Sequence, residues 1–311
     1  MEEIEKTKNY RLGINTGFAL NRFPMPEQWM KVVGHELGIK YVQLTADLIN
    51  PSLGPEIINN YITRINKCRK EYNIEIDSVM TGAFTRVNHF SSPDEKTRRF
   101  WIDWFKKLID VALAIGANNV SSHFGILSYE DLHNKERRDF IFQETVNAWK
   151  ELAVYGKEKG LSYLSWEPMS IAREYGETIK ETKIIQKHLS DSKIPIYLCL
   201  DVDHGDLSST NPDDTNPYEW IKEFAKITPL IHLKQSLIDK GGHYPFIEEY
   251  NSQGIIVPSK IIDALDSAEA LKNTLLLLEL SFREREPTDS NVLAHLKESV
   301  NYWRKYVETI L

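Results

Sequence analysis

Four short apolar runs in the second half of the chain constrain its fold more than any other feature. They read Leu164-Ser165-Trp166-Glu167, Leu198-Cys199-Leu200-Asp201, Leu230-Ile231-His232 and Leu276-Leu277-Leu278-Glu279. Runs of this kind are typical of strands that are buried on both faces, as in a parallel sheet. A carboxylate at the end of such a strand is hard to explain by packing, because burying an unpaired charge is costly. Since converging carboxylates also repel one another, the pattern indicates a bound divalent cation and a metal-dependent enzyme.

Strand-like and helix-like segments alternate from one end of the chain to the other. The predicted strands end near Asn15, Leu44, Thr81, His123, Glu167, Asp201, His232 and Glu279, with separations of 29 to 47 residues. Amphipathic helices are predicted between them over 57–71, 94–115, 136–159, 174–190, 216–226, 259–271 and 290–309. Eight strands alternating with about eight helices is the count of a (β/α)8 barrel. The sequence therefore predicts an α/β protein with a single (β/α)8 TIM barrel.

The domain organisation follows from length and from the absence of a linker. A chain of 311 residues has room for two domains, but no Pro/Gly/Ser-rich segment divides it, and barrels of this size commonly form one domain. We expect one domain over 1–311. The least regular stretches, 202–215 and 235–257, follow predicted strands, so they should be enlarged loops on the carboxyl face of the barrel. We predict that 235–257 is a lid-like insertion loop after the seventh strand.

Composition narrows the class of partner and the compartment. The net charge of −7 gives no basic surface for nucleic acid. No apolar run is long enough for a membrane span, and the N-terminus lacks a secretory signal. Cys68 and Cys199 both lie in predicted regular elements, so we expect packing residues rather than a disulfide. These observations predict a cytoplasmic protein that acts on a small molecule, without nucleic acid or membrane partners.

The predicted metal ligands are Glu167, Asp201, His232 and Glu279, at the carboxyl ends of strands five to eight. These strands are neighbours around a barrel, so their last residues can converge on one ion. Three oxygen donors and one imidazole favour a single Mn²⁺, with Mg²⁺, Co²⁺ or Zn²⁺ as alternatives. Taken singly, each residue has an ordinary explanation, because a strand-end carboxylate can cap a helix and a lone His can be a satisfied core residue. Their occurrence at four consecutive strand ends favours the metal site.

These residues resemble the xylose-isomerase-like TIM barrels, a family of sugar and sugar-phosphate isomerases and epimerases. The resemblance covers the whole barrel and rests on Trp166-Glu167-Pro168, Asp201-Val202-Asp203-His204, Ile231-His232-Leu233 and Leu278-Glu279. It implies that the four predicted ligands bind one divalent metal and that His204 contacts substrate. Within the family the chain looks closest to tetrulose-phosphate (erythrulose 4-phosphate) 3-epimerases of erythritol catabolism, through Asp47-Leu48 and Ile171-Ala172-Arg173-Glu174. It departs from many members at Lys234-Gln235-Ser236, where they place an acidic residue.

The resemblance implies inversion of the carbon next to the carbonyl of a short ketose phosphate, with L- or D-erythrulose phosphate as the expected sugar. A divalent metal would stabilise the enediolate as a Lewis acid. Because Glu167 and Glu279 come from the fifth and eighth strands, we predict that one removes the proton and the other delivers a proton to the opposite face. Aldose–ketose isomerisation and 3-epimerisation of a free ketose both pass through the same enediolate, so both remain open.

Further substrate contacts are predicted near the metal. The candidates are His204, Arg173, His123, Asn15, Thr81 and Lys234. The Arg173 guanidinium can bind two phosphate oxygens, although a solvated Arg at a helix start explains it equally well. Arg283 and Arg285 are the other phosphate candidates. His123 can equally be a core residue, Asn15 and Thr81 can be turn residues, and Lys234 can be a loop residue.

Two other functional classes fit the sequence less well than a sugar-phosphate epimerase. Barrel endonucleases need two or three ions and more ligand His residues than the strand ends offer, and the acidic charge balance opposes a DNA groove. An inactive sugar-sensing barrel predicts a damaged set of ligands, whereas all four are present. Barrels that resemble this one often pair, which implies a homodimer.

Overall fold

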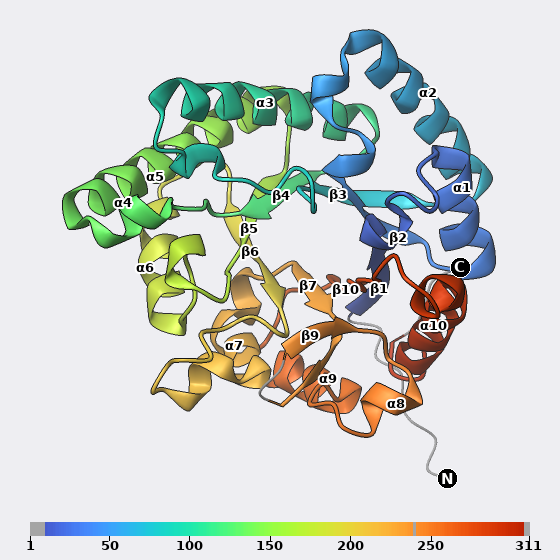
Figure 1. Cartoon of the computed structure of the whole chain (residues 1–311). Helices are drawn as coiled ribbons and strands as arrows, with labels where there is room; N and C mark the ends of the chain where they lie inside the picture. Colours follow the sequence, from blue (N-terminus) through green and yellow to red (C-terminus); the bar gives the residue numbers. More distant parts are fainter. Residues whose placement is uncertain (1–9, 239–240, 308–311) are drawn as a thin grey trace.

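A computed structural model describes residues 10–238 and 241–307, and its centre is a closed barrel of eight parallel strands (Figure 1). The strands are β1 (Tyr10–Asn15), β2 (Tyr41–Thr45), β3 (Glu75–Met80), β4 (Asn119–His123), β5 (Tyr163–Glu167), β6 (Ile196–Asp201), β7 (Leu230–Leu233) and β10 (Thr274–Leu278). They follow the order β1-β10-β7-β6-β5-β4-β3-β2 around the barrel. The predicted α/β class and TIM barrel are confirmed, and every predicted strand end lies within one residue of an observed one.

Helices form the outer ring around this barrel (Figure 1). They are α1 (Pro26–Met30), α2 (Pro55–Glu71), α3 (Glu95–Ala114), α4 (Tyr129–His133), α5 (Lys135–Lys159), α6 (Ile179–Leu189), α7 (Pro217–Phe224), α8 (Glu248–Asn251), α9 (Pro258–Ser267) and α10 (Thr288–Trp303). No helix in the described ranges is long and apolar enough to cross a membrane. Both cysteines are free and buried, as expected.

Two helical predictions differ from the structure. The first concerns the segment after β1, for which the sequence analysis predicted no helix. The structure has α1 there, and α1 continues into a π-helical turn over Lys31–Glu36. The second is the predicted helix over 174–190, which begins later, at Ile179, because Tyr175 has a φ of 64° that no right-handed helix contains. The side chain of Thr178 then caps the helix by accepting a hydrogen bond from the backbone N–H of Glu181, at 3.1 Å.

The two faces of each strand pack against different surroundings, since side chains alternate along a strand. In β10, Leu276 and Leu278 belong to the main apolar core that includes residues of the surrounding helices. Leu275 and Leu277 belong to a second group, here called the barrel-interior cluster. Its members are Tyr41, Met80, Cys199, Leu230, Leu275 and Leu277. A residue two positions beyond a member of this cluster therefore faces the mouth of the barrel.

The described residues of the segment 235–257 include regular structure where the sequence predicted an irregular loop, and residues 239 and 240 of the predicted loop lie outside the described ranges. The segment contains an antiparallel hairpin of β8 (Gln235–Leu237) and β9 (Gly241–Tyr244), followed by α8. The buried side chain of Gln235 connects the two parts. Its Nε2 donates to Asn251 Oδ1 at 3.0 Å and its Oε1 accepts from Ile256 N at 3.0 Å. The lid-like role of this hairpin remains a prediction.

Candidate active site

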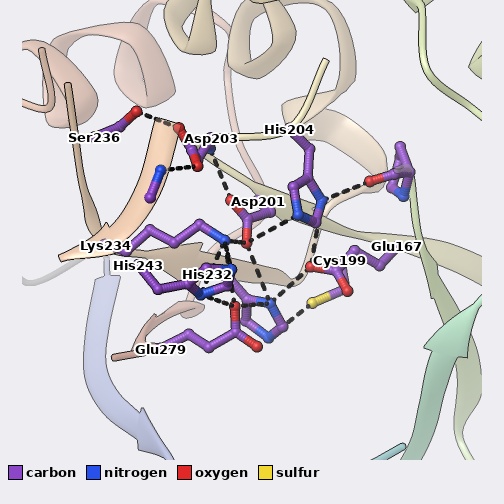
Figure 2. A network of polar contacts seen from close by, with 12 residues as sticks. Glu167, Cys199, Asp201, Asp203, His204, His232, Lys234, Ser236, His243 and Glu279 are labelled. Atoms are coloured by element: carbon purple, nitrogen blue, oxygen red, sulfur yellow. Dashed lines mark hydrogen bonds and ion pairs between the residues drawn. The ribbon is translucent and has the colours of Figure 1, made fainter. Parts of the chain in front are cut away.

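Four strand ends bring Glu167, Asp201, His232 and Glu279 together (Figure 2). One ligand atom from each residue lies within 4.8 Å of the ligand atoms of the others. The Nδ1 atom of His232 is 3.0 Å from Glu167 Oε1, 3.4 Å from Glu279 Oε2 and 3.9 Å from Asp201 Oδ2. Three of the four residues are buried, and Glu279 is half-buried. The structure thus brings together all four predicted ligands.

Strand periodicity explains why these side chains converge. Asp201, His232 and Glu279 each lie two residues beyond a member of the barrel-interior cluster, so they continue its face to the carboxyl end of the barrel. Glu167 stands in the same relation to Ser165, whose hydroxyl bonds Ser121 and Asn119 inside the barrel. In the strand register Asp201 lies opposite His232, which places the two side chains side by side.

The donor set fits a divalent cation. Asp201 Oδ2 is buried and accepts no well-oriented hydrogen bond within the described residues. Three carboxylates facing one imidazole nitrogen leave a surplus of negative charge in a buried place, which is unfavourable without a cation. Oxygen donors with a single imidazole suit hard or borderline divalent ions.

The second ring nitrogen of His232 has a buried partner that the sequence analysis missed. Its Nε2 lies 2.7 Å from Gln43 Oε1, and the same oxygen accepts a hydrogen bond from Asn15 Nδ2, also at 2.7 Å. Burial lowers the pKa of His232, but Cys199, Glu279 and Glu167 outweigh it and hold the pKa well above its ordinary value as long as no ion is bound. With a metal ion bound, a proton on Nε2 would leave the Nδ1 lone pair for the ion, which is the tautomer a metal ligand requires. Gln43 follows Tyr41 of the barrel-interior cluster by two positions. A polar residue at an inward position of β2 was the signal that could have identified it.

Lys234, which follows β7 directly, is a fully buried cation in the same site (Figure 2). Its Nζ lies 2.5 Å from Asp201 Oδ2 and 3.7 Å from Glu279 Oε2, and it donates to Nε2 of His243 at 2.9 Å. Burial lowers the pKa of Lys234, but Asp201 and Glu279 outweigh it, so the pKa lies above its ordinary value. The ammonium group therefore stays charged and balances part of the carboxylate charge.

The pKa values of the carboxyl groups of Glu167 and Asp201 depend on burial and on the charged residues beside them. Burial raises the pKa of Glu167, yet His232 and His204 reverse the effect and hold it below its ordinary value. Burial likewise raises the pKa of Asp201, and His204 and Lys234 bring it well below its usual range. Both carboxyl groups are therefore ionised at neutral pH, as a ligand and a general base must be.

The cluster opens into a cavity of about 520 Å³, large enough for a small sugar. Of the predicted residues, it is lined by Asn15, Thr81, His123, Glu167, His204 and Glu279. Four charged residues that the sequence analysis did not select as site residues also line it, namely Arg22, Asp47, Arg86 and Glu284. His243, on the hairpin, contributes to the wall as well.

Comparison with known proteins identifies the family. A family model described as the xylose isomerase-like TIM barrel matches residues 33–306. The chain belongs to this family. It is 39% identical over 300 residues to a D-erythrulose 1-phosphate 3-epimerase from Brucella abortus (strain 2308), with 96% of each chain covered. The resemblance expected from the sequence is thus confirmed, and the protein is an enzyme of the isomerase class.

Solved structures agree with this assignment. A protein from Rhodospirillum rubrum, named as a candidate xylose isomerase, superposes with a TM-score of 0.85 at 26% identity, covering 96% of this chain and 99% of its own. A D-psicose 3-epimerase solved in the presence of D-fructose superposes with a TM-score of 0.67 at 14% identity, covering 93% and 95% of the two chains. At that identity the second match shows the fold alone.

In this xylose isomerase-like barrel, His204 has one ring nitrogen engaged and one directed at the site. Its Nδ1 donates to the carbonyl oxygen of Pro168 at 2.9 Å. Its Nε2 lies 3.8 Å from Asp201 Oδ2 and carries no other bond in the described part of the chain. Because His204 lines the cavity, Nε2 can contact a substrate oxygen.

The other predicted substrate contacts already use their polar atoms in hydrogen bonds within the protein. Asn15 uses Oδ1 to accept from Gly17 N at 2.7 Å, besides its bond to Gln43, and Thr81 Oγ1 bonds Ser122 Oγ at 2.9 Å. His123 is almost fully buried, and its Nε2 donates to the Val87 carbonyl at 2.8 Å. Burial lowers the pKa of His123 well below its ordinary value, and the nearby His89 lowers it further, so the ring is neutral.

Arg173 does not line the cavity, and neither does the fully buried Lys234. Its guanidinium donates to the Leu127 carbonyl and to Glu174 Oε1, both at 3.4 Å. Arg283 and Arg285 are likewise absent from the lining. The guanidinium groups that reach the cavity wall are those of Arg22 and Arg86.

Proposed function

We propose that this enzyme is a divalent-metal-dependent 3-epimerase of a short ketose phosphate, with an erythrulose phosphate as substrate and Mn²⁺ as the preferred ion. The observation that carries the proposal is the pair Glu167 and Glu279, two carboxylates that come from different strands and lie 3.0 Å and 3.4 Å from the same His232 nitrogen. Both also line the cavity. The relative named as a D-erythrulose 1-phosphate 3-epimerase supports the choice of sugar.

Glu167, Asp201, His232 and Glu279 would hold the divalent ion, which would supply Lewis-acid stabilisation of negative charge on the substrate oxygens beside the reacting carbon. Asp201 and His232 would act only as metal ligands. Gln43 keeps the His232 ring in the required tautomer, and Lys234 balances the charge of Asp201.

Inversion needs a base on one face of the reacting carbon and an acid on the other. One carboxylate, Glu167 or Glu279, takes the proton from C3, and the electron pair of the C–H bond moves to form the enediolate. The other residue starts the turnover as the protonated carboxylic acid and delivers its proton to C3 from the opposite face, so the two residues exchange protonation states. His204 Nε2 can hydrogen-bond a substrate oxygen during this exchange, because Nδ1 is fixed by Pro168.

The test combines proton exchange with stereochemistry. Wild-type enzyme in D2O should exchange the C3 proton of erythrulose phosphate and interconvert its two enantiomers, without formation of an aldehyde. Glu279→Gln should abolish exchange while one metal ion per chain stays bound. Near-full turnover by this variant would exclude the two-base mechanism.

A matched control is Glu284→Gln, since Glu284 also lines the cavity but bonds Asn21 on its rim, with a distance of 2.8 Å. This control should leave C3 exchange largely intact. Aldehyde formation by the wild type, without interconversion of the enantiomers, would instead identify an aldose–ketose isomerase on the same site.

A further inference from the structure

We propose that Arg86 binds the phosphate group of the substrate, in a subsite on the β3–β4 side of the cavity. This inference rests on the proposed function, because it assumes that the ketose carries a phosphate. It assigns phosphate recognition to a residue that follows β3 and not to Arg173, the candidate from the sequence.

The charges along the cavity wall limit where a phosphate can lie. The acidic residues that line the cavity are Asp47, Glu167, Glu279 and Glu284, and the arginines that line it are Arg22 and Arg86. A phosphate brings a charge of about −1.5 to −2 at neutral pH, so it needs a positive partner away from these carboxylates. Arg22 and Arg86 are the two candidates of the described wall.

Arg22 is already committed to other groups. Its Nε forms a 2.6 Å ion pair with Asp289 Oδ1, and its Nη2 donates to the Phe282 carbonyl at 3.1 Å. Its side chain is only 12% exposed. A phosphate at Arg22 would therefore have to displace a formed ion pair.

Arg86 keeps donors available. Its Nη2 pairs with Glu174 Oε2, and among the described residues no hydrogen bond uses its Nε or Nη1. Its side chain is 34% exposed, about three times the exposure of Arg22. A planar guanidinium with free donors on one side is suited to bind two phosphate oxygens at once.

The position of Arg86 relative to the reacting centre is also suitable. The next residue, Val87, accepts the hydrogen bond from His123, and His123 lies opposite Glu167 in the register of β4 and β5. Arg86 is close enough to His123 to contribute to the lowering of its pKa. Arg86 therefore follows β3, and only β4 separates this strand from β5, which carries the predicted base Glu167; both residues line the same cavity.

Glu174 explains how Arg86 is held and supplies the control. This buried carboxylate pairs with Arg86 through Oε2 and contacts Arg173 through Oε1. The two arginines thus share one anchor, but only Arg86 reaches the cavity. Replacing either one removes the same charge and a bond to the same carboxylate, which makes Arg86→Met and Arg173→Met a matched pair.

The experiment compares erythrulose phosphate with free erythrulose in the metal-loaded enzyme. Arg86→Met should lower the ratio of the two kcat/KM values, phosphorylated over free, by about 10- to 100-fold, the value of a hydrogen-bonded charge pair. Inorganic phosphate should inhibit wild-type turnover of free erythrulose competitively, and Arg86→Met should weaken this inhibition by a similar factor. Arg173→Met should leave the ratio and the inhibition unchanged, and Arg86→Lys should give intermediate values.

Each result decides between proposals. An unchanged ratio in Arg86→Met, in a variant that keeps wild-type metal affinity and circular dichroism, overturns the subsite. If the ratio of kcat/KM values falls only in Arg22→Met or only in Arg173→Met, that residue binds the phosphate, and the assignment to Arg86 is overturned. If the wild type acts on no ketose phosphate at all, the proposed function fails, and this outcome is recognised before any variant is compared.

Discussion

Replacing Gln43 with leucine tests whether a partner outside the ligand set controls the metal site. Gln43 is fully buried, and its Oε1 accepts two hydrogen bonds of 2.7 Å, from His232 Nε2 and from Asn15 Nδ2. Leucine has a similar size but no acceptor, so Asn15 Nδ2 loses its partner and His232 Nε2 keeps only the weak contact with Cys199 Sγ at 3.3 Å.

The magnitude follows from these two bonds. A buried donor left without a partner costs about 1–3 kcal/mol, so the loss of stability should be about 2–6 kcal/mol for the pair. Part of this is offset, because Gln43 Nε2 is itself buried without a partner and leucine removes it. For the metal, loss of the group that fixes a ligand His weakens affinity about 10- to 100-fold, or ~1.4–2.7 kcal/mol.

The assay is a Mn²⁺ titration in competition with a chelating dye, together with thermal unfolding in excess chelator. Gln43→Glu is the control, because it keeps an oxygen acceptor for His232 and should not weaken Mn²⁺ binding. A Gln43→Leu protein that binds Mn²⁺ as tightly as the wild type would refute the reasoning that Gln43 fixes the His232 tautomer. Lower thermal stability alone would not support it.

Three further perturbations test other parts of the structure. Burial lowers the pKa of His89 from 6.5 to about 3. The neutral ring therefore contributes stability that is full above pH 6.5 and is lost as the pH falls toward 3. His89→Gln should flatten the fall of the unfolding temperature over this pH window. Mn²⁺ at about 100 times its Kd should stabilise the protein by about 2.7 kcal/mol, an effect that chelator removes and His232→Ala lacks. Asp203 accepts from Gly242 N at 2.8 Å and also from Ser236 Oγ, so Asp203→Ala should speed hydrogen exchange in the β8–β9 hairpin.

Contrary results are easily recognised. A wild-type pH profile in His89→Gln would mean that other groups dominate acid unfolding. Equal stabilisation of His232→Ala by Mn²⁺ would place the ion elsewhere, and unchanged exchange in Asp203→Ala would show that Gln235 alone anchors the hairpin.

The sequence by itself determined the barrel and the four converging side chains. Parallel strands that are buried on both faces must be apolar, so they stand out as runs, and the side-chain period of two assigns their ends to the interior. The side chains that meet at this edge are those of Glu167 and Asp201, which end β5 and β6, of His232, the next-to-last residue of β7, and of Glu279, which follows β10. They meet because neighbouring parallel strands carry their carboxyl ends to the same edge of the barrel. No knowledge of the loops is needed for this result.

The conformations of the loops depend on tertiary contacts, so the sequence alone did not determine them. Tyr175 adopts a left-handed conformation that delays α6, although its segment continues the helical pattern of the sequence. The stretch after β7 pairs with itself as a hairpin, since Gln235 and Asp203 supply bonds from positions that sequence spacing does not connect. Local pattern carries little information about such contacts.

Tertiary structure also decided which polar residues serve the site. Gln43 and His232 are 189 positions apart and meet only because the barrel closes. Arg86 meets the buried carboxylate of Glu174 across 88 residues of sequence, whereas Arg173 is its neighbour in the chain, and only packing decides which of the two lines the cavity. Strand ends are fixed by a local period, whereas the direction of a long side chain on a loop depends on partners brought together by the whole fold.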